Sequence, residues 1–477
     1  MNNKISLFSR KSMVFPLRAL LTMAPVIAML SSCSLKKSTV QLPMEPPVSF
    51  SASGTDSIPD YWWTSFNDSA LNATIDTAMS TNFNLKTAWY RLVEARKVVD
   101  RESASLFPEI FASLRGETGS GQTAFEVNDN MWLGLTADYE LDLWGRIRYG
   151  IEAEEYRMEA SLNDFRTAAL TLSAELSLAW YRLAEARQQL EIAYEQAETN
   201  EKVLELIRAR YGSGQTRSVD IFRQEQLLEA SRERVIFRET QLRLYKHQLA
   251  VLSGKAPGDS LFTEEMYIPE LPPLPETGLP VELVKRRPDI QSALFRLYAA
   301  DMDLASAMSA RYPRISFTAQ LSTSGSAEQL FRDWAWSFSG NLLAPLFYGG
   351  ELQAEADRSE AVKNQRLYEY GQTVLTAFRE VEDALIRELK QRESIASIKK
   401  QHELAKISYE QLRVSYFNGM SDYLDVLTAL EQEQQLRRDL LTAKLELIEY
   451  RVALYRALAG GFEPDIAYIN IGNQTDE

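Results

Sequence analysis

The sequence is poor in the side chains that build disulfides and transition-metal sites. Its 477 residues contain one cysteine, Cys33, and two histidines, His247 and His402. A single cysteine excludes an intramolecular disulfide framework, and so few soft ligands leave almost no material for a transition-metal site. We therefore expect no metal and no cofactor other than a lipid on Cys33, which is argued below.

Motifs for nucleotide binding and for nucleophilic catalysis are also missing. The chain has no P-loop, no paired-glycine dinucleotide fingerprint and no nucleophile elbow. Acidic residues outnumber basic ones by 66 to 52, and the net charge of −14 argues against nucleic acid as a partner. Most of the acids stand at helix-surface spacing. These absences predict a protein that is not an enzyme.

Long apolar runs are confined to the N-terminus. No later segment supplies the roughly 20 apolar residues of a membrane helix. Ala19–Leu30 is shorter than that and follows a positively charged leader, which predicts a signal peptide over residues 1–32. The segment Leu30-Ser31-Ser32-Cys33 resembles a bacterial lipobox. That resemblance implies a mature chain that begins at an acylated Cys33, and Ser34 resembles the outer-membrane sorting pattern.

The most informative feature present is one long pattern that occurs twice. A constant offset of 205 residues joins Pro108 to Pro313, Gly145 to Gly350, Gly214 to Gly419, Asp220 to Asp425 and Tyr245 to Tyr450. Most matched pairs are Gly, Pro, Tyr or apolar residues, the types that set turns and packing. A long internal repeat is typical of a duplicated architecture in which like units lie side by side.

The repeat and the composition divide the chain into six parts. We predict a signal peptide with lipobox (1–32), a lipidated N-terminal tether (33–59), a first repeat (60–254), a proline-rich linker (255–284), a second repeat (285–461) and a C-terminal tail (462–477). Six prolines between 257 and 280 prevent a regular helix in the linker.

Each repeat contains two segments with the period-two pattern of strands. Residues 131–143 alternate apolar side chains such as Leu135 with polar ones such as Thr136, and residues 315–321 and 336–344 do the same. An extended run also starts near 106 and ends near 115. Polar loops are expected at 116–130 and 322–329. Strands of ~9–11 residues are long enough to cross a bilayer when tilted.

The rest of each repeat has the pattern of helices. One helix is expected over 68–103, and residues 145–209 and 350–414 contain no proline. About 65 helical residues span roughly 100 Å at ~1.5 Å per residue. Each long helix reaches a glycine turn, and a second helix follows to Leu252 or Leu458, so each repeat ends in a helical hairpin.

Four membrane strands cannot close a barrel alone, because the narrowest membrane barrels need about eight. Open strand edges are not tolerated in lipid, so the chain must associate with copies of itself. Two copies would give eight strands and a plugged interior, and three would give twelve strands and a lumen. The polar strand faces favour a lumen, but the strand pattern alone does not decide between a dimer and a trimer.

Three motifs resemble the TolC-like outer membrane factor family, in its lipoprotein branch of drug-efflux channels. The motifs are Trp62-Trp63-x-x-Phe66-x-Asp68-x-x-Leu71, Arg286-Arg287-Pro288-Asp289-Ile290 and Pro345-Leu346-Phe347-x-Gly349-Gly350. The resemblance covers residues 60–461. It implies a mainly α protein with a membrane β-barrel contribution, and a homotrimer that forms a twelve-stranded β-barrel and an α-helical periplasmic barrel. It also implies a passive exit duct for small molecules, with a periplasmic adaptor, an inner-membrane pump and outer membrane lipid as partners.

The same resemblance implies the working residues. Asp220 and Asp425 match acids that narrow the pore, and Tyr416 matches a tyrosine bonded to the acid at Asp220. Two departures from the family pattern are Ser421, which stands for an arginine, and Thr428, which stands for a further aspartate. The adaptor would meet the hairpin tips, Ser213, Gly214, Gln215, Asn418, Gly419 and Met420. Acids just after a turn also cap helices, and both roles are compatible.

Two other functions stay open. The same fold serves as the exit channel of type I protein or peptide secretion systems. A lipid-anchored coiled-coil scaffold without a pore is the alternative from another class, although the alternation at 131–143 counts against it.

Overall fold

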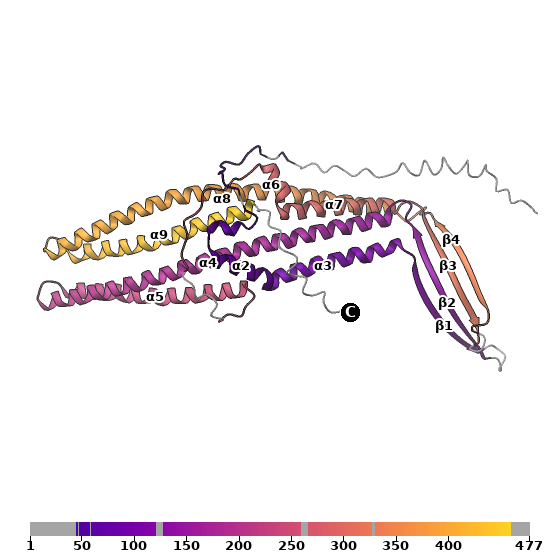
Figure 1. Ribbon diagram of the computed structural model, residues 1–477, viewed down its shortest axis with the longest axis horizontal. Helices are drawn as coiled ribbons and strands as arrows, with labels where there is room; N and C mark the ends of the chain where they lie inside the picture. The colour runs from indigo at the N-terminus through magenta and orange to yellow at the C-terminus, as the bar shows by residue number, and fades with distance from the viewer. Residues whose placement is uncertain are drawn as a thin grey trace, which may run out of the picture. The chain divides into compact units, whose positions relative to one another are not determined.

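The chain folds into two successive copies of one order of elements. In the computed structural model the first copy contains η1 (Trp62–Phe66), α2 (Ser69–Thr81), α3 (Phe83–Ser103), η2 (Ala104–Leu106), β1 (Glu109–Ser120), β2 (Val127–Leu141), α4 (Arg146–Gly212) and α5 (Ser218–Leu252). The second contains α6 (Pro280–Arg286), α7 (Pro288–Ser309), β3 (Arg314–Gly325), β4 (Trp334–Leu343), α8 (Glu351–Phe417) and α9 (Tyr423–Leu458). Figure 1 shows the four strands at the opposite ends of α4 and α8 from the hairpin turns.

The structure describes residues 44–45, 47–57, 59–120, 127–258, 266–326 and 330–458, with backbone only at 117–120 and 127–130. All of them belong to one unit, Leu42–Glu477. The predicted signal peptide, Cys33 with most of the tether, and the C-terminal tail lie outside the described residues.

The four strands form one antiparallel sheet in the order β1-β2-β3-β4. The register pairs apolar residues with apolar residues, as in Leu135 with Leu321 and Ala137 with Ala319. It pairs polar residues on the other face, as in Asp138 with Thr318, whose hydroxyl donates to the Asp138 carboxylate at 2.6 Å. Opposite residues in an antiparallel pair share a face, so the predicted alternation yields one apolar and one polar face across all four strands.

The expected polar loop at 116–130 is wrong at both of its ends. The β1–β2 ladder continues from Gly116 opposite Met131 to Ser120 opposite Val127, and β3 similarly reaches Gly325 rather than ending at 321. Backbone hydrogen bonds make the ladder, so polar side chains near a hairpin end do not stop it.

The single helix expected over 68–103 is also wrong, because it breaks at Asn82. The Asn82 side-chain oxygen accepts from the Leu85 N–H at 3.0 Å and caps α3, while its amide donates to the Leu252 carbonyl at 2.8 Å. Asp68 caps α2 by accepting from Ala70 and Leu71. Asparagine is a strong N-cap, and here the end of α5 holds it in place.

The main core lies where α2, α4 and α9 meet. Trp62 stacks on Tyr455 there, and Phe66 meets both rings edge-on. The Trp62 indole donates to Ser173 on α4 at 3.2 Å. Beside it, the fully buried Arg451 pairs with Glu388 and donates to the carbonyls of Pro272 and Pro273 at 2.9 Å. Arg451 therefore joins α9 to Glu388 on α8 by an ion pair and to the proline-rich linker by hydrogen bonds.

Candidate functional site

The turns of the two helical hairpins have the same backbone. After α4, the Gly214 N–H bonds the Tyr211 carbonyl and the Gln215 N–H bonds the Arg210 carbonyl, both at 2.9 Å. After α8, Gly419 and Met420 repeat this pair of bonds to Tyr416 and Ser415. These are Schellman motifs, which need a left-handed residue, and φ is +73° at Gly214 and +76° at Gly419. The sequence repeat is thus a repeat of turn geometry.

The tip residues named from the sequence are all exposed to solvent. Gln215 and Met420 follow the two glycines, and Met420 is an apolar side chain that is 71% exposed. A Cβ atom added at Gly214 or Gly419 would have no atom of the described residues within 4 Å apart from its chain neighbours. The tips are therefore free for contact with another molecule.

Beneath the turns, the two hairpins pack on each other through an apolar cluster. Its buried members are Ile207, Leu227, Tyr416, Tyr423, Val426, Leu427 and Leu430. They come from all four long helices. Apolar contacts thus hold the ends of the two hairpins together. The polar groups nearby form hydrogen bonds between helices that are already packed.

Asp220 sits in the third position of α5 and is only 2% exposed. Its carboxylate accepts from the Thr216 hydroxyl at 2.9 Å and from the Arg217 N–H at 3.3 Å. Arg217 and Arg223 approach the two carboxylate oxygens at 3.6 and 3.9 Å. Asp220 therefore caps the helix and also has two cations beside it.

Tyr416 reaches Asp220 through an intermediate, so the direct bond implied by the family resemblance is absent in this protomer. The Tyr416 hydroxyl lies 3.4 Å from the Thr216 hydroxyl, which itself donates to Asp220. The guanidinium of Arg210 lies 4.8 Å from the Tyr416 ring centre and 5.5 Å from that of Phe417. We call Tyr416, Thr216 and Asp220 the tip relay, because it joins α8 to the start of α5.

Asp425 is the second acid named from the sequence, and it lies in a different environment. It is exposed, and no described residue hydrogen-bonds or pairs with its carboxylate. Ser421 donates to the Leu412 carbonyl at 3.4 Å, and Thr428 donates to its own helix at Leu424. Two charged residues lie near these positions in the sequence: Arg217 pairs with Asp220, whereas Asp422 is exposed.

Sequence reasoning missed a second tie between the hairpins. The buried Tyr423 hydroxyl on α9 donates to the Gln224 side chain on α5, and the Gln224 amide donates to the Asn200 carbonyl at 2.7 Å. Burial raises the pKa of Tyr423 above its usual range. No spacing signal links a tyrosine to a glutamine 199 residues away, so only the fold reveals this pair.

The seam between α4 and α9 is polar. Gln189 on α4 donates to the Arg438 carbonyl at 3.1 Å, and Gln196 donates to the Gln434 carbonyl at 3.1 Å. Arg438 returns a bond from its guanidinium to the Gln196 oxygen at 2.6 Å. Buried polar groups need partners, and here each hairpin supplies them to the other.

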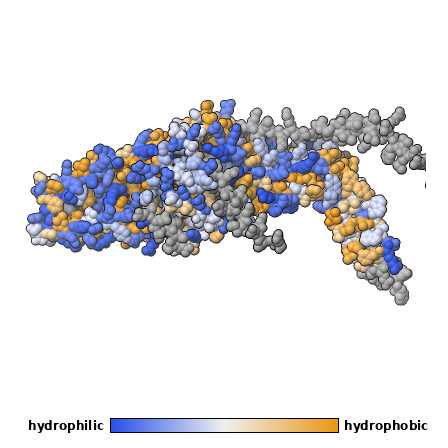
Figure 2. Space-filling view, viewed as in Figure 1, coloured by the Kyte–Doolittle hydropathy of each residue, from blue (hydrophilic) through white to orange (hydrophobic). Residues whose placement is uncertain are grey.

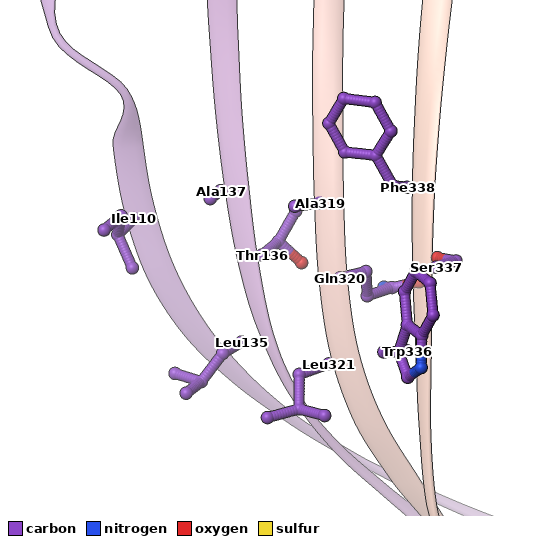
Figure 3. Close-up of a pocket in the computed structure, with 10 residues that line it drawn as sticks. All are labelled: Ile110, Leu135, Thr136, Ala137, Ala319, Gln320, Leu321, Trp336, Ser337 and Phe338. Atoms are coloured by element: carbon purple, nitrogen blue, oxygen red, sulfur yellow. The ribbon is translucent and has the colours of Figure 1, made fainter. Parts of the chain in front are cut away.

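The sheet presents its apolar face to the surroundings. Figure 2 shows apolar residues gathered over part of the strands, whereas polar and apolar residues mix over the helices. Trp336 and Phe338 are 79% and 64% exposed. An open hollow of about 610 Å³ lies along the strands. Figure 3 shows the small side chains of Ala137 and Ala319 near Leu135 and Leu321 in its lining. An exposed apolar face of this extent marks a membrane or protein contact.

Two absences hold for the described part of the chain. None of its helices combines the length and the apolar character needed to cross a membrane. The same residues contain no group of three or more metal-binding side chains.

The sheet has one exposed apolar face and is joined to two helices of 67 residues, α4 and α8, whose far ends are linked by hydrogen bonds. This combination is that of a membrane-channel protein. The outer membrane efflux protein model matches residues 74–255 and 279–460, and the chain belongs to this family.

Curated relatives are similar over nearly their whole length. The pyoverdine export outer membrane protein OpmQ of Pseudomonas aeruginosa is 30% identical over 425 residues, covering 85% of this chain and 88% of the relative. The cation efflux system protein CusC of Escherichia coli is 27% identical over 452 residues, covering 91% and 97%. The solved outer-membrane channel OprN is 27% identical with a TM-score of 0.83, covering 89% of this chain and 99% of OprN.

These findings confirm the expected fold class and function. The protein is an outer membrane channel of a tripartite efflux system. Its mainly helical, duplicated chain contributes four strands, so the trimer has a twelve-stranded β-barrel joined to a helical barrel.

Proposed function

We propose that this channel is a passive exit duct that is closed at the ends of its helical hairpins by the tip relay. Cargo would enter there from an inner-membrane pump and a periplasmic adaptor, and leave through the strand barrel. The role needs no catalytic group. The observation that carries the proposal is the hydrogen-bonded path from Tyr416 through Thr216 to Asp220, because it joins two hairpins that must separate if the end is to widen.

The strength of the relay suits a gate. A hydrogen bond between neutral partners contributes about 0.5–1.5 kcal/mol net. Such a tie is weak enough to open when a partner binds and strong enough to favour the closed end. The apolar cluster below the turns keeps the two hairpins in contact while their tips separate.

The edges of the protomer support closure by neighbouring copies. Within the described sheet β1 pairs only with β2, and β4 pairs only with β3, so each outer strand keeps an open edge. Two different surfaces in contact give a heterologous interface, which closes into a ring when the rotation fits. Exposed apolar side chains on α5 and α8, such as Phe237 and Leu389, fit the same arrangement.

The adaptor is proposed to bind the exposed tips, Ser213, Gly214, Gln215, Asn418, Gly419 and Met420. Their exposure and the shared Schellman backbone support a repeated docking element, since each protomer offers two similar tips. Binding at a tip would act on the residue directly before the relay, because Gln215 precedes Thr216.

The mature chain is proposed to be anchored by lipid on Cys33. The resemblance of residues 30–33 to a lipobox supports the lipid, and the family supports the outer-membrane location. Intact-mass measurement of the protein purified from its host membrane should give an acylated chain that begins at Cys33. A mature chain that starts elsewhere and carries no lipid would exclude the anchor.

Cargo is proposed to be set by the pump. The names of the relatives mention pyoverdine, cations, and solvents including toluene, which do not belong to one chemical class. A duct that takes whatever the pump delivers accounts for that range, and we assign no cargo to this chain.

Conductance in planar bilayers tests the gate. Thr216→Val removes the bridging hydroxyl at nearly constant volume and should raise the mean conductance of the trimer. Thr428→Val is the matched control, because Thr428 also lies at a hairpin end but bonds only its own helix. Equal conductance in both variants, with unchanged circular dichroism and oligomer mass, would exclude the relay as the gate.

A further inference from the structure

Arg210 lies where the tips of the two hairpins meet. It belongs to the last turn of α4, and its guanidinium carbon lies 4.8 Å from the ring centre of Tyr416. The same carbon lies 5.5 Å from the ring centre of Phe417, the last residue of α8. A guanidinium within about 6 Å of a ring centre is attracted by the negative face of the ring. Arg210 thus joins the first hairpin to the second through two adjacent rings.

The Arg210 side chain has no polar partner that would explain its position. Its Nε is buried without a hydrogen-bond acceptor, and no ion pair among the described residues includes it. Arg208, two residues earlier, instead pairs with Glu225 of its own hairpin at 2.6 Å. A buried charged donor without a partner is destabilising, and the two ring faces are the groups that offset this cost.

The two copies of the repeat differ at these positions in a complementary way. At the offset of 205 residues, Arg210 corresponds to Ser415, and Phe417 corresponds to Gly212. The carbonyls of Arg210 and Ser415 accept equivalent bonds of the two turns, so the backbone is shared and only the side chains differ. The first copy therefore supplies the cation, and the second supplies the pair of adjacent rings.

One of the two rings also belongs to the tip relay. Tyr416 is 8% exposed, and its ring centre lies 5.5 Å from that of Tyr423 and 5.9 Å from that of Phe417. Its hydroxyl lies 3.4 Å from the Thr216 hydroxyl. A cation held on the ring restricts where the ring can lie, so Arg210 also positions that hydroxyl for the relay.

We propose that Arg210 is a positioning residue of the closed channel, which holds the two hairpin tips together by a cation–π clamp on Tyr416 and Phe417. This inference rests on the proposed function, a gate at the hairpin ends, but the clamp does not need the hydrogen bonds of the tip relay. Phe417 is 43% exposed and lies outside the apolar cluster, so it can move away from the guanidinium while that cluster stays packed.

Single-channel recording of the purified trimer in planar bilayers tests the clamp through the ratio of open to closed time. Arg210→Met keeps the long apolar stem and removes the charge. It should raise the ratio about tenfold, because a partly desolvated cation–π contact has roughly that worth. Arg208→Met is the matched control. It loses only the ion pair with Glu225 and should gate as the wild type does.

Substitutions of the ring should change the ratio in opposite directions. Phe417→Leu removes the π face and should raise the ratio, whereas Phe417→Trp should lower it, because indole attracts cations most strongly. Arg210→Lys keeps the charge and should recover most of the closure. The double variant Arg210→Met/Phe417→Leu should open little more than Arg210→Met alone, since both changes remove one contact. A residue that only fills space would not give this pattern.

Tyr416→Phe separates the clamp from the relay, because it keeps the ring and removes the hydroxyl. If Arg210→Met opens the channel while Tyr416→Phe and Thr216→Val do not, the clamp stands and the relay fails. If those two variants open the channel and Arg210→Met gates like Arg208→Met, the clamp is overturned and the relay stands. Unchanged gating in all of them overturns both.

A variant that does not assemble leaves the clamp testable. If Arg210→Met forms no trimer, the comparison of Phe417→Leu with Phe417→Trp replaces it, because that ring is partly exposed. Equal ratios of open to closed time in these two variants would overturn the proposal.

Discussion

The two hairpin tips share a backbone but differ in charge. Asp220 and Asp425 each stand six residues after the left-handed glycine of a Schellman turn and in the third position of the following helix. Asp220 is 2% exposed and bonded, whereas Asp425 is exposed and has no partner among the described residues. The same turn is therefore followed by a buried, hydrogen-bonded acid, Asp220, in one copy and by a solvent-facing acid, Asp425, in the other.

The residues around each acid explain the difference. At an offset of 205 residues, Arg217 corresponds to Asp422, and Arg223 corresponds to Thr428. The first tip thus surrounds its aspartate with two cations, and the second tip replaces one cation with another acid and removes the other. The two copies share the turn, and the different residues at two positions change the surroundings of the acid.

The largest expected effect tests the region in which the two copies agree, the strands. Leu135→Arg in the first copy and Phe338→Arg in the second put a charge on the apolar face. Each should destabilise the assembled barrel by about 2–4 kcal/mol if the site lies near the bilayer midplane. The measurement is the fraction of heat-resistant trimer in membranes.

The control for that pair comes from the polar face. Ser339→Arg should leave the trimer fraction close to wild type, because Ser339 pairs with Thr318 on the polar side. Thr136 is unsuitable as a control, because it is only 8% exposed. Equal loss at Ser339 and Phe338 would contradict the assignment of one lipid-facing and one polar face.

Local patterns predicted the elements of the fold well. Alternation identified both faces of the sheet, and the ends of α5 and α9 at Leu252 and Leu458 follow from the helical pattern. The break at Asn82 was missed because its partner, the Leu252 carbonyl, is 170 residues away. Strand ends were missed because ladder bonds do not depend on side-chain polarity.

The sequence predicted which residues lie at the hairpin tips, but not which side chains they contact. The glycine turns and Asp220 could be named from the repeat and the family resemblance. Thr216 was missed as the bridge to Tyr416, and so was the pair of Tyr423 with Gln224, because each joins residues about 200 positions apart. Arg451 and Glu388 gave no signal either, since charged residues at helical spacing are usually solvated.

The next effect concerns the hydrogen bond that joins the two copies, between Tyr423 on α9 and Gln224 on α5. Gln224→Leu removes the acceptor of the buried Tyr423 hydroxyl and the donor to the Asn200 carbonyl, so two buried groups lose their partner. We expect a total loss of about 1–3 kcal/mol, because a buried group without its partner is destabilising. Urea unfolding followed by circular dichroism measures it.

Tyr423→Phe sharpens the assignment, because it removes the hydroxyl and keeps the ring in the apolar cluster. It should cost less than Gln224→Leu, and the double variant should cost little more than Gln224→Leu alone. Additive losses in the double variant would show that the two residues act independently.

A smaller loss of stability is expected at Asp220. Asp220→Ala removes a helix cap, worth about 0.5–2 kcal/mol, and leaves the Thr216 hydroxyl without its acceptor. The tip relay then loses its anchor, so the conductance in planar bilayers should rise. Asp220→Asn keeps a capping oxygen without the charge and should recover most of the stability. A closed pore in both variants would restrict Asp220 to capping.

The smallest effect on stability, and the clearest on function, is expected at Asp425. Its exposed carboxylate has no described partner, so Asp425→Ala should change the free energy of unfolding by less than about 0.5 kcal/mol. In a trimer the substitution removes three negative charges from the tip, and acidic rings favour cations. The reversal potential under a salt gradient should therefore shift toward lower cation selectivity, while the mean conductance stays near the wild-type value. Asp422→Ala should act in the same direction, because that acid is also exposed and lies three residues earlier. If Asp425→Ala leaves selectivity unchanged but destabilises the protein as much as Asp220→Ala does, the two tips are equivalent after all and both acids serve only as helix caps.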